Sequence, residues 1–200
     1  LVLESDNALL IYGSGSSTFY NGQPSPNLIR IAFNGERDMT FPQGTGFDWS
    51  VSAVAVQADG RILVGGVFNS YNGTPVPALV RLLPNGQLDQ SFQLDVPVNA
   101  DRITAICPLS DGKILVGGGD LTFGSGHWLA RLTDSGSWDS DFSGSMNAVP
   151  FSGGPISNIH AIGGGQAIIT GPFLQYDGES AGFIARINAE ALAQQRAFGK

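Results

Sequence analysis

The chain has 200 residues, a formal net charge of −7, 28 glycines, 11 prolines and a single cysteine. Its 42% hydrophobic content is too high for a disordered acidic tail, so the glycines and prolines must punctuate many short ordered elements. No apolar run approaches the roughly 20 residues that span a bilayer. With two lysines and no basic cluster, duplex nucleic acid and anionic membranes are poor partners. The lone Cys107 cannot form an internal disulfide, and a zinc site of four cysteines is excluded.

Four copies of one unit make up the sequence. Repeated arginines fix the period, because they lie 51, 50 and 55 residues apart, at Arg30, Arg81, Arg131 and Arg186. This spacing predicts a single repeat domain with approximate repeat boundaries at 1–48, 49–100, 101–154 and 155–200. Positions that agree among the copies serve the shared scaffold, whereas positions that differ are open to a role in recognition.

In chain order, each repeat begins with two predicted strands. The first is a short β-rich run, VSAVAV from Val51 or ITAICP from Ile103, and an Asp-Gly pair follows it. Asp-Gly between two apolar runs is typical of a tight hairpin turn of the primed type, which needs positive φ. The second strand, ILVGG from Ile62 or Ile114, is nearly continuously apolar and suits burial on both faces. Its glycine pair indicates a bulge or a close backbone approach.

A glycine-rich loop, a third strand and a short fourth strand complete the predicted repeat. The third strand is PALVRLL, HWLARL or GFIARI, and a turn such as Asn85-Gly86 leads to a fourth segment that ends at Phe92 or Phe142. Four antiparallel strands per repeat predict an all-β protein, a β-propeller of four blades or four consecutive blades of a larger propeller. The 20-residue coils of a parallel β-helix and the 3.6-residue period of helical repeats are absent. For residues 188–198, helix and strand are equally open.

Several segments of the repeats are similar to a known family. They are ADGRILVGGVF, YNGT, LVRLLPNG and LDQSF in the second repeat, and SDGKILVGG, LARL and WDSDF in the third. With these segments the chain resembles the delta-60 repeat family of bacterial β-propeller-type domains. The resemblance implies a propeller-type fold and an extracellular or bacterial cell-surface setting, and it carries no catalytic or ligand signature. The fourth repeat departs from the pattern, because Gly164-Gly165 replaces Asp-Gly and the aspartate of LDQSF has no counterpart.

An arginine, an aspartate and a phenylalanine recur together in the first three repeats. The aspartate follows the arginine by eight residues and the phenylalanine by eleven, as in Arg30, Asp38 and Phe41. A strand, a tight turn and a returning strand would place the two charged side chains side by side. We therefore expect Arg–Asp pairs that tie two strands together, with the phenylalanine wedged between blades, rather than a ring of anion-binding arginines.

An aromatic residue ends the loop after the second strand in every repeat, at Tyr20, Tyr71, Phe123 and Tyr176. Together these side chains could form a ring that stacks on sugar rings or accepts an apolar side chain of a partner. The alternative, which we favour, is that each aromatic side chain folds back and pins its own loop.

The connectors between repeats differ in length and chemistry, and variable loops over a repeated scaffold are where specificity usually resides. They read PQGTGFDWS, QLDVPVNADR and SGSMNAVPFSGGP. The side chains most capable of recognition there suit a neutral or cationic ligand, and they are Trp49, Asp95, Asp101, Arg102, Asn147 and Phe151.

The sequence contains no catalytic motif. It lacks a GxSxG elbow, an HExxH helix and a P-loop, so we expect no enzyme activity, no cofactor and no metal. His160 falls at the position that Glu4, Ala55 and Cys107 hold in the other repeats. A buried histidine that contacts Glu4 across a closed ring is favoured over a catalytic one, and Cys107 is expected to be a small buried residue.

These features predict a non-enzymatic recognition or adhesion module that binds a glycan or a protein through connector loops on one face. A structural or oligomerising repeat module is the second hypothesis, and a glycan-acting hydrolase with an unrecognised site is the third. The chain begins within a first strand and has no initiator methionine or signal peptide, so we expect it to be part of a larger chain or assembly.

Overall fold

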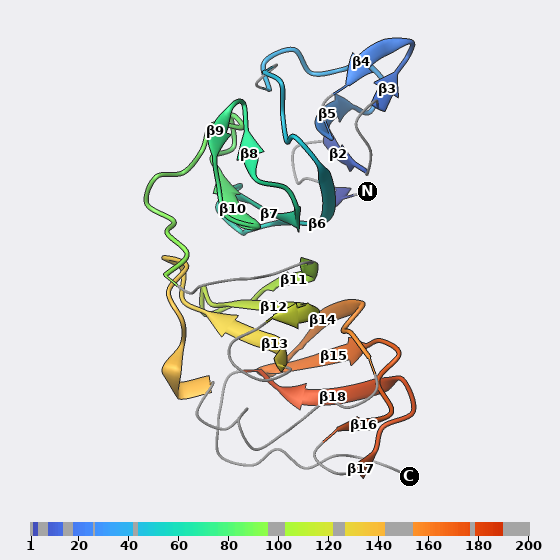
Figure 1. Cartoon of the computed structure of the whole chain (residues 1–200), viewed down its shortest axis with the longest axis vertical. Coiled ribbons are helices and arrows are strands. Elements are labelled where there is room, and N and C mark those ends of the chain that lie inside the picture. Colours follow the sequence, from blue (N-terminus) through green and yellow to red (C-terminus); the bar gives the residue numbers. More distant parts are fainter. Residues whose placement is uncertain are drawn as a thin grey trace. The chain divides into compact units, whose positions relative to one another are not determined.

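A computed structural model of the chain consists of antiparallel β-sheets (Figure 1). It describes residues 2–3, 8–13, 18–25, 27–41, 44–95, 103–121, 127–142, 154–176 and 179–189. The contacts divide the chain into an N-terminal half, Leu1–Phe92, and a C-terminal half, Gln93–Lys200. Each half contains two three-stranded sheets, and the all-β fold class is confirmed.

Each repeat contributes one three-stranded antiparallel sheet with its second strand in the middle. Sheet 1 consists of β1 (Val2–Leu3), β2 (Ala8–Tyr12) and β5 (Leu28–Ala32), and sheet 2 of β6 (Ser50–Val56), β7 (Ile62–Val67) and β10 (Leu79–Leu82). Sheet 3 consists of β11 (Ile103–Pro108), β12 (Ile114–Leu121) and β13 (His127–Leu132), and sheet 4 of β14 (Asn158–Gly163), β15 (Gln166–Thr170) and β18 (Ile184–Asn188). The central strands β7 and β12 are buried on both faces where their side chains are described, as predicted, whereas β2 and β15 are mostly half-buried.

In the first three repeats the predicted short fourth strand is reduced to a single bridge, so the expectation of a four-stranded sheet is wrong there. In sheet 2, Leu82 pairs with Leu88 alone, and equivalent bridges join Ile31 to Arg37 and Leu132 to Trp138. The repeated aspartate ends the pairing. Asp89 Oδ1 accepts hydrogen bonds from the N–H and the hydroxyl of Ser91, at 3.0 and 2.6 Å, and this local bonding turns the chain away from the sheet.

The Asp-Gly turns are three-residue loops with a glycine bulge, not the expected primed turns. The carbonyl of Gln57 accepts a hydrogen bond from Gly60 N–H at 2.9 Å, and Gln57 N–H donates to the carbonyl of Arg61 at 2.8 Å. Gly60 has a φ of +82°, and Asp59 is not among the residues with positive φ, as in a type I turn followed by a left-handed glycine. The same two bonds recur in the turns at Ala32–Glu36, Leu83–Gln87, Leu109–Lys113 and Thr133–Ser137.

A small hairpin occupies the loop after the second strand in three repeats. The pairs are β3 (Thr18–Tyr20) with β4 (Gln23–Ser25), β8 (Ser70–Tyr71) with β9 (Thr74–Pro75), and β16 (Gln175–Tyr176) with β17 (Glu179–Ser180). The primed turn is found here, because Asn72 and Gly73 both have positive φ, +50° and +77°. Asn21 and Gly22 repeat this geometry in the first repeat, with φ of +49° and +75°.

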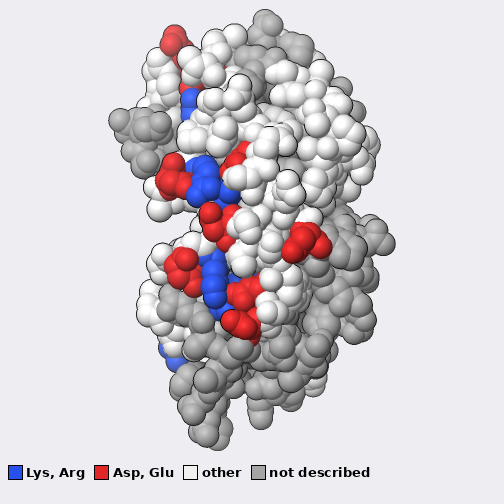
Figure 2. All heavy atoms as spheres, turned by 90° about the vertical axis from the view of Figure 1, so that its left-hand side faces the viewer, with Lys and Arg blue, Asp and Glu red and all other residues white. Residues whose placement is uncertain are grey.

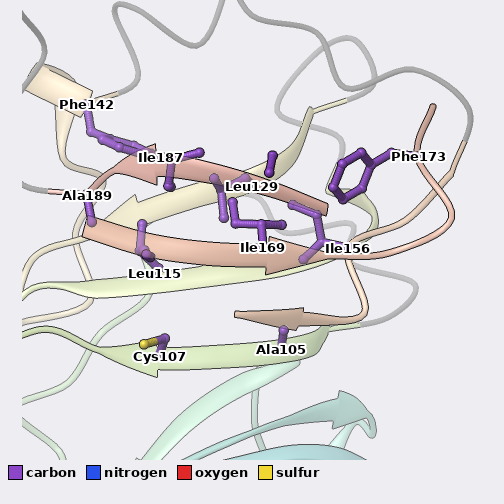
Figure 3. Close-up of a cluster of buried hydrophobic side chains, with 12 residues drawn as sticks. Ala105, Cys107, Leu115, Leu129, Phe142, Ile156, Ile169, Phe173, Ile187 and Ala189 are labelled. Carbon is purple, nitrogen blue, oxygen red and sulfur yellow. The ribbon is translucent and has the colours of Figure 1, made fainter. Parts of the chain in front are cut away.

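Each half has its own hydrophobic core. In the C-terminal half, strands of sheets 3 and 4 enclose a cluster in which Phe142 lies with Ile187 and Ala189, so the phenylalanine packs against the following repeat as predicted (Figure 3). Cys107 is 8% exposed in the same cluster, which confirms its expected burial. A corresponding cluster in the N-terminal half includes Leu10, Phe41, Phe47, Val51, Val64 and Leu82.

Candidate functional site

The repeated arginine and aspartate form an ion pair in each of the first three repeats. The distances from Arg Nε to Asp Oδ2 are 2.8, 2.7 and 2.7 Å in the pairs Arg30–Asp38, Arg81–Asp89 and Arg131–Asp139. Each guanidinium also lies over the repeated phenylalanine ring, at 5.0, 4.9 and 4.5 Å from the centroid, in Phe41, Phe92 and Phe142. The Arg–Asp pairing predicted from the eight-residue spacing is therefore confirmed, and these arginines serve the scaffold.

Burial raises the pKa of the repeated aspartates, whereas hydrogen bonding lowers it. Burial of Asp139 opposes its ionisation, but hydrogen bonds and charge attraction from Lys113 and Arg131 outweigh this effect, so the pKa of the carboxyl lies below its ordinary value. Lys113 Nζ is 3.0 Å from Asp139 Oδ2. Figure 2 shows the resulting pattern, in which basic side chains on this face adjoin acidic ones.

The same arginine also reaches the following repeat. Arg30 Nη1 donates a hydrogen bond to the carbonyl oxygen of Pro84 at 2.8 Å, and Arg131 Nη1 donates to the carbonyl of Ala189. Pro84 and Ala189 are equivalent, because each lies three residues after the repeated arginine of its own repeat. Sequence reasoning missed this link, since a backbone carbonyl that is 54 or 58 residues away leaves no side-chain signal.

Two of the repeated aromatics are hydrogen-bonded to their own repeat. Tyr20 donates from its hydroxyl to the carbonyl of Gly35 at 2.6 Å, and Tyr71 donates to the carbonyl of Gly86 at 2.8 Å. Both acceptors are the bulge glycines of the turn after the third strand. The loop-pinning alternative therefore explains Tyr20 and Tyr71. Phe123 and the side chain of Tyr176 lie outside the described residues.

The connector between the first two repeats presents Trp49, whose side chain is 53% exposed. The backbone beneath it is held in place, because Asn27 Nδ2 donates to the carbonyls of Phe47 and Trp49 at 3.2 and 2.7 Å. Phe47 is 2% exposed and lies 4.3 Å from the ring of Phe68 and 4.5 Å from that of Tyr71. An exposed indole thus stands on a connector that is anchored on both sides of it.

Asp48, which the sequence analysis did not single out, fixes the same connector. Its Oδ1 accepts hydrogen bonds from the N–H groups of Asn69 and Ser70 at 2.9 and 3.0 Å. Burial opposes ionisation of Asp48, but these bonds outweigh it and lower the pKa, so the carboxylate is charged at neutral pH. In the sequence, only its position beside Trp49 pointed to Asp48, because its hydrogen-bond donors lie in a loop 21 residues away.

Of the other candidate residues in the connectors, the structure describes Asp95 alone. Its Oδ1 accepts a hydrogen bond from the N–H of Trp138 at 3.0 Å, so this carboxylate supports the turn before the bridge in the third repeat. The remaining candidates from the connectors lie outside the described residues, and they are Asp101, Arg102, Asn147 and Phe151.

His160 is exposed, so its expected burial is wrong. It lies on β14, an edge strand of sheet 4 whose residues are exposed or half-buried, whereas the equivalent edge strands β6 and β11 are largely buried. The register pairs His160 with Ile168, and the equivalent positions in the other repeats are Val2, Ala55 and Cys107. Val2, rather than Glu4, is thus its counterpart, and Glu4 lies outside the described residues.

Within the described ranges, no group of three or more His, Cys, Asp or Glu side chains could hold a metal ion. The three repeated aspartates face arginines, and Asp48 and Asp95 accept backbone N–H bonds. In the same part of the chain no helix is long and apolar enough to cross a membrane.

The repeated three-stranded antiparallel sheets make the described part of the chain an all-β repeat structure. Residues 5–41 and 57–92 match the family described as "Domain of unknown function (DUF5122) beta-propeller". Both stretches end at the phenylalanine of an Arg–Asp–Phe set, Phe41 in the first and Phe92 in the second. The match supports a β-propeller repeat family. No curated protein matches the chain.

Proposed function

We propose that the chain is a non-enzymatic recognition module of an extracellular or bacterial surface protein, built as four propeller blades or as four consecutive blades of a larger propeller. It binds a glycan or a protein through connector loops on one face. The resemblance to delta-60 repeats supports the setting. The observation that carries the binding role is the exposed indole of Trp49 on an anchored connector.

Trp49 has the properties of a binding anchor. A large aromatic side chain supplies much of the binding energy at recognition sites, and a surface that is ordered before binding loses less entropy when the ligand arrives. The hydrogen bonds from Asn27 and to Asp48 order this connector in the absence of a ligand. Trp49 is also a feature of one connector rather than of the repeat, so it is not explained by the scaffold.

The chemistry of this connector favours a glycan. The face of an indole ring suits the C–H face of a sugar or an apolar partner side chain. The neighbouring carboxylate of Asp48 is ionised at neutral pH and repels anionic ligands, in line with the net charge of −7. Neutral and amino sugars are therefore the first candidates, and sialylated or sulfated glycans are the poorest. Asp95, Asp101 and Arg102 in the second connector remain candidates for further contacts.

A glycan array tests this proposal with two matched variants. Trp49→Ala removes the exposed indole, and Phe33→Ala removes an aromatic ring of similar exposure, 59%, from a turn of the first repeat. We expect wild type and Phe33→Ala to bind the same neutral or amino glycans, and Trp49→Ala to lose them. Binding that is equal in all three proteins would reject Trp49 as the anchor.

A structural or oligomerising role is the second candidate, and exposed apolar side chains in the fourth repeat favour it. Leu174, Phe183 and Ile184 are 54%, 58% and 56% exposed. Sedimentation velocity over a range of concentrations tests this role, with Phe183→Ser and Ile184→Thr as the variants. Self-association that both variants abolish, together with an empty glycan array, would replace the recognition proposal. Release of sugar from an array glycan would instead indicate the third hypothesis, a glycan-acting hydrolase.

A further inference from the structure

The end of sheet 2 that carries Trp49 has a single charged residue in the sequence around it. Between residues 39 and 58 this residue is Asp48, and residues 62–80 include no charged side chain. The strand β6 separates this end from the turn at Asp59, over a length of about 20 Å. This length exceeds the Debye length of about 8 Å in physiological salt, so Asp48 sets the sign of the local potential.

The charged residues at the opposite end of sheet 2 neutralise one another. Arg81 Nε lies 2.7 Å from Asp89 Oδ2, and Arg61 pairs with Asp59 and approaches Asp89 at 3.7 Å. Among the residues that the structure describes, Asp48 has no basic side chain as a partner, and no charge attraction contributes to its pKa. Its negative charge is therefore available to a cation of a ligand.

The carboxylate of Asp48 is held in one orientation although its side chain is exposed. The N–H groups of Asn69 and Ser70 donate to its Oδ1 at 2.9 and 3.0 Å. These bonds lower its pKa, so the group carries its charge before a ligand arrives. Both bonds end on Oδ1, so Oδ2 is the oxygen that a ligand can reach.

Asp48 and Trp49 lie together at a bend of the chain. Phe47, just before the bend, bridges to Tyr71 and is 2% exposed, and Ser50, just after it, begins β6. Side chains alternate between two faces along a straight strand, but the bend interrupts this alternation. The Cα atoms of the two residues are about 3.8 Å apart and both side chains are exposed, so one sugar residue can contact both.

We propose that this bend binds the ammonium group of a glycan with unsubstituted amines, such as a glucosamine oligomer. The ammonium group pairs with Oδ2 of Asp48, and the C–H face of the same sugar stacks on the indole of Trp49. The side chain of Asn69 is also exposed beside the carboxylate and suits the hydroxyl groups of a sugar. This inference rests on the proposed function and narrows its ligand to sugars with a free amine.

Calorimetric titration of the 200-residue chain with a glucosamine oligomer and with its N-acetylated form of the same length tests the proposal. At about pH 5.5 a free amine is protonated and the Asp48 carboxyl is ionised. An exposed ion pair together with a cation–π contact should make the free-amine oligomer bind about fivefold or more tightly. A lysine peptide of equal charge, which offers the ammonium group without a sugar, should bind more weakly than the glucosamine oligomer.

Two matched variants assign the preference to one carboxylate. Asp48→Asn keeps an Oδ1 acceptor for the loop but removes the charge, so it should bind the two oligomers alike. Asp59→Asn removes an equal charge from the opposite end of the sheet, where the side chain is 46% exposed, and should keep the preference. Should Asp48→Asn fold poorly, the comparison of the two oligomers on the wild-type chain decides.

Four outcomes would overturn the proposal: no binding of either oligomer, equal affinity of wild type for both, a preference that Asp48→Asn retains, or tighter binding of the lysine peptide. Equal binding of both oligomers that Trp49→Ala abolishes rejects the free-amine assignment alone. An empty glycan array rejects the proposed function with it.

Discussion

Arg30 donates a hydrogen bond from Nη1 to the carbonyl oxygen of Pro84, which lies 2.8 Å away and 54 residues further along the chain. The Nε of the same guanidinium pairs with Asp38 at 2.8 Å, and its planar face lies over Phe41. One side chain therefore closes the turn of its own repeat and fastens the next repeat to it. Arg131 repeats the arrangement with Ala189. Only a planar group with several fixed donors can do this, so a lysine would not substitute.

Removal of the buried Arg131 should be strongly destabilising. Arg131 and Asp139 are 2% and 7% exposed, and breaking a buried ion pair leaves an uncompensated charge. Arg131→Ala is expected to lower the free energy of unfolding by about 3–5 kcal/mol in urea denaturation. Arg61→Ala is the control, because Arg61 is 26% exposed and an ion pair nearer the surface contributes about 1 kcal/mol or less. Equal losses of stability in the two variants would show that burial of the Arg131–Asp139 pair does not increase its contribution.

The repeated aspartates predict instability in acid. Hydrogen bonds outweigh burial and hold the pKa values of Asp38, Asp89 and Asp139 below the ordinary value in the folded chain. A lowered folded-state pKa adds stability that is fully present above the unfolded value and is lost as the pH falls through the folded one. We expect a declining free energy of unfolding below about pH 4. Asp139→Asn should be less stable at neutral pH and show a shallower decline, and an unchanged slope would contradict this assignment.

The two pinned tyrosines should differ in their contribution to stability. Tyr71→Phe removes the donor to the carbonyl of Gly86, which is buried and cannot bond to water instead. Tyr20→Phe removes the donor to the carbonyl of Gly35, which water can reach because Tyr20 is only half-buried. An unsatisfied buried polar group costs about 1–3 kcal/mol. Urea denaturation should therefore show a loss in that range for Tyr71→Phe and a smaller loss for Tyr20→Phe. A larger effect at Tyr20 would contradict this ranking by burial.

Gly13 and Gly66 are equivalent, because each lies three residues after a leucine that pairs with the repeated arginine, and they should respond differently to the same substitution. Gly66→Ala places a methyl group 2.2 Å from the carbonyl oxygen of Ser50, and overpacking of this kind costs about 1–3 kcal/mol. Gly13→Ala has open space and should change the free energy of unfolding by about 0.5 kcal/mol at most. Thermal unfolding of both variants measures the difference. A strongly destabilised Gly13→Ala variant would contradict the open space beside the Cα of Gly13.

Much of the fold could be predicted from the sequence because the same pattern of strands and turns recurs in each repeat. Apolar runs predicted the strands, and the eight-residue spacing predicted the Arg131–Asp139 pair, since both depend on local order along the chain. The glycine pair correctly indicated a bulge, which lies between Val51 and Ala53 beside Gly66. The fourth strand was overestimated because side chains such as Asp89 bond to backbone and stop the ladder after one bridge.

The candidate site was less predictable, because its properties depend on contacts between distant residues. Trp49 was identified from its place in a connector, but its exposure and anchoring depend on Asn27 and Asp48. The hydroxyl partner of Tyr71 lies in another turn of the repeat, so the sequence left pinning and ligand stacking both open. His160 was placed in the interior because Ala55 and Cys107, which hold the same register position, are buried, but β14 is exposed at this position.

The central claim is that Trp49 anchors a ligand on a connector that is ordered in advance. Isothermal titration of the glycan with the strongest array signal into wild type, Trp49→Ala and Phe33→Ala tests it most directly. An exposed aromatic anchor is worth about 2 kcal/mol or more on truncation, so the Trp49→Ala variant should bind at least about thirtyfold more weakly. Phe33→Ala should retain the affinity of wild type. Equal affinity in all three proteins, or the same loss in both variants, would contradict the account.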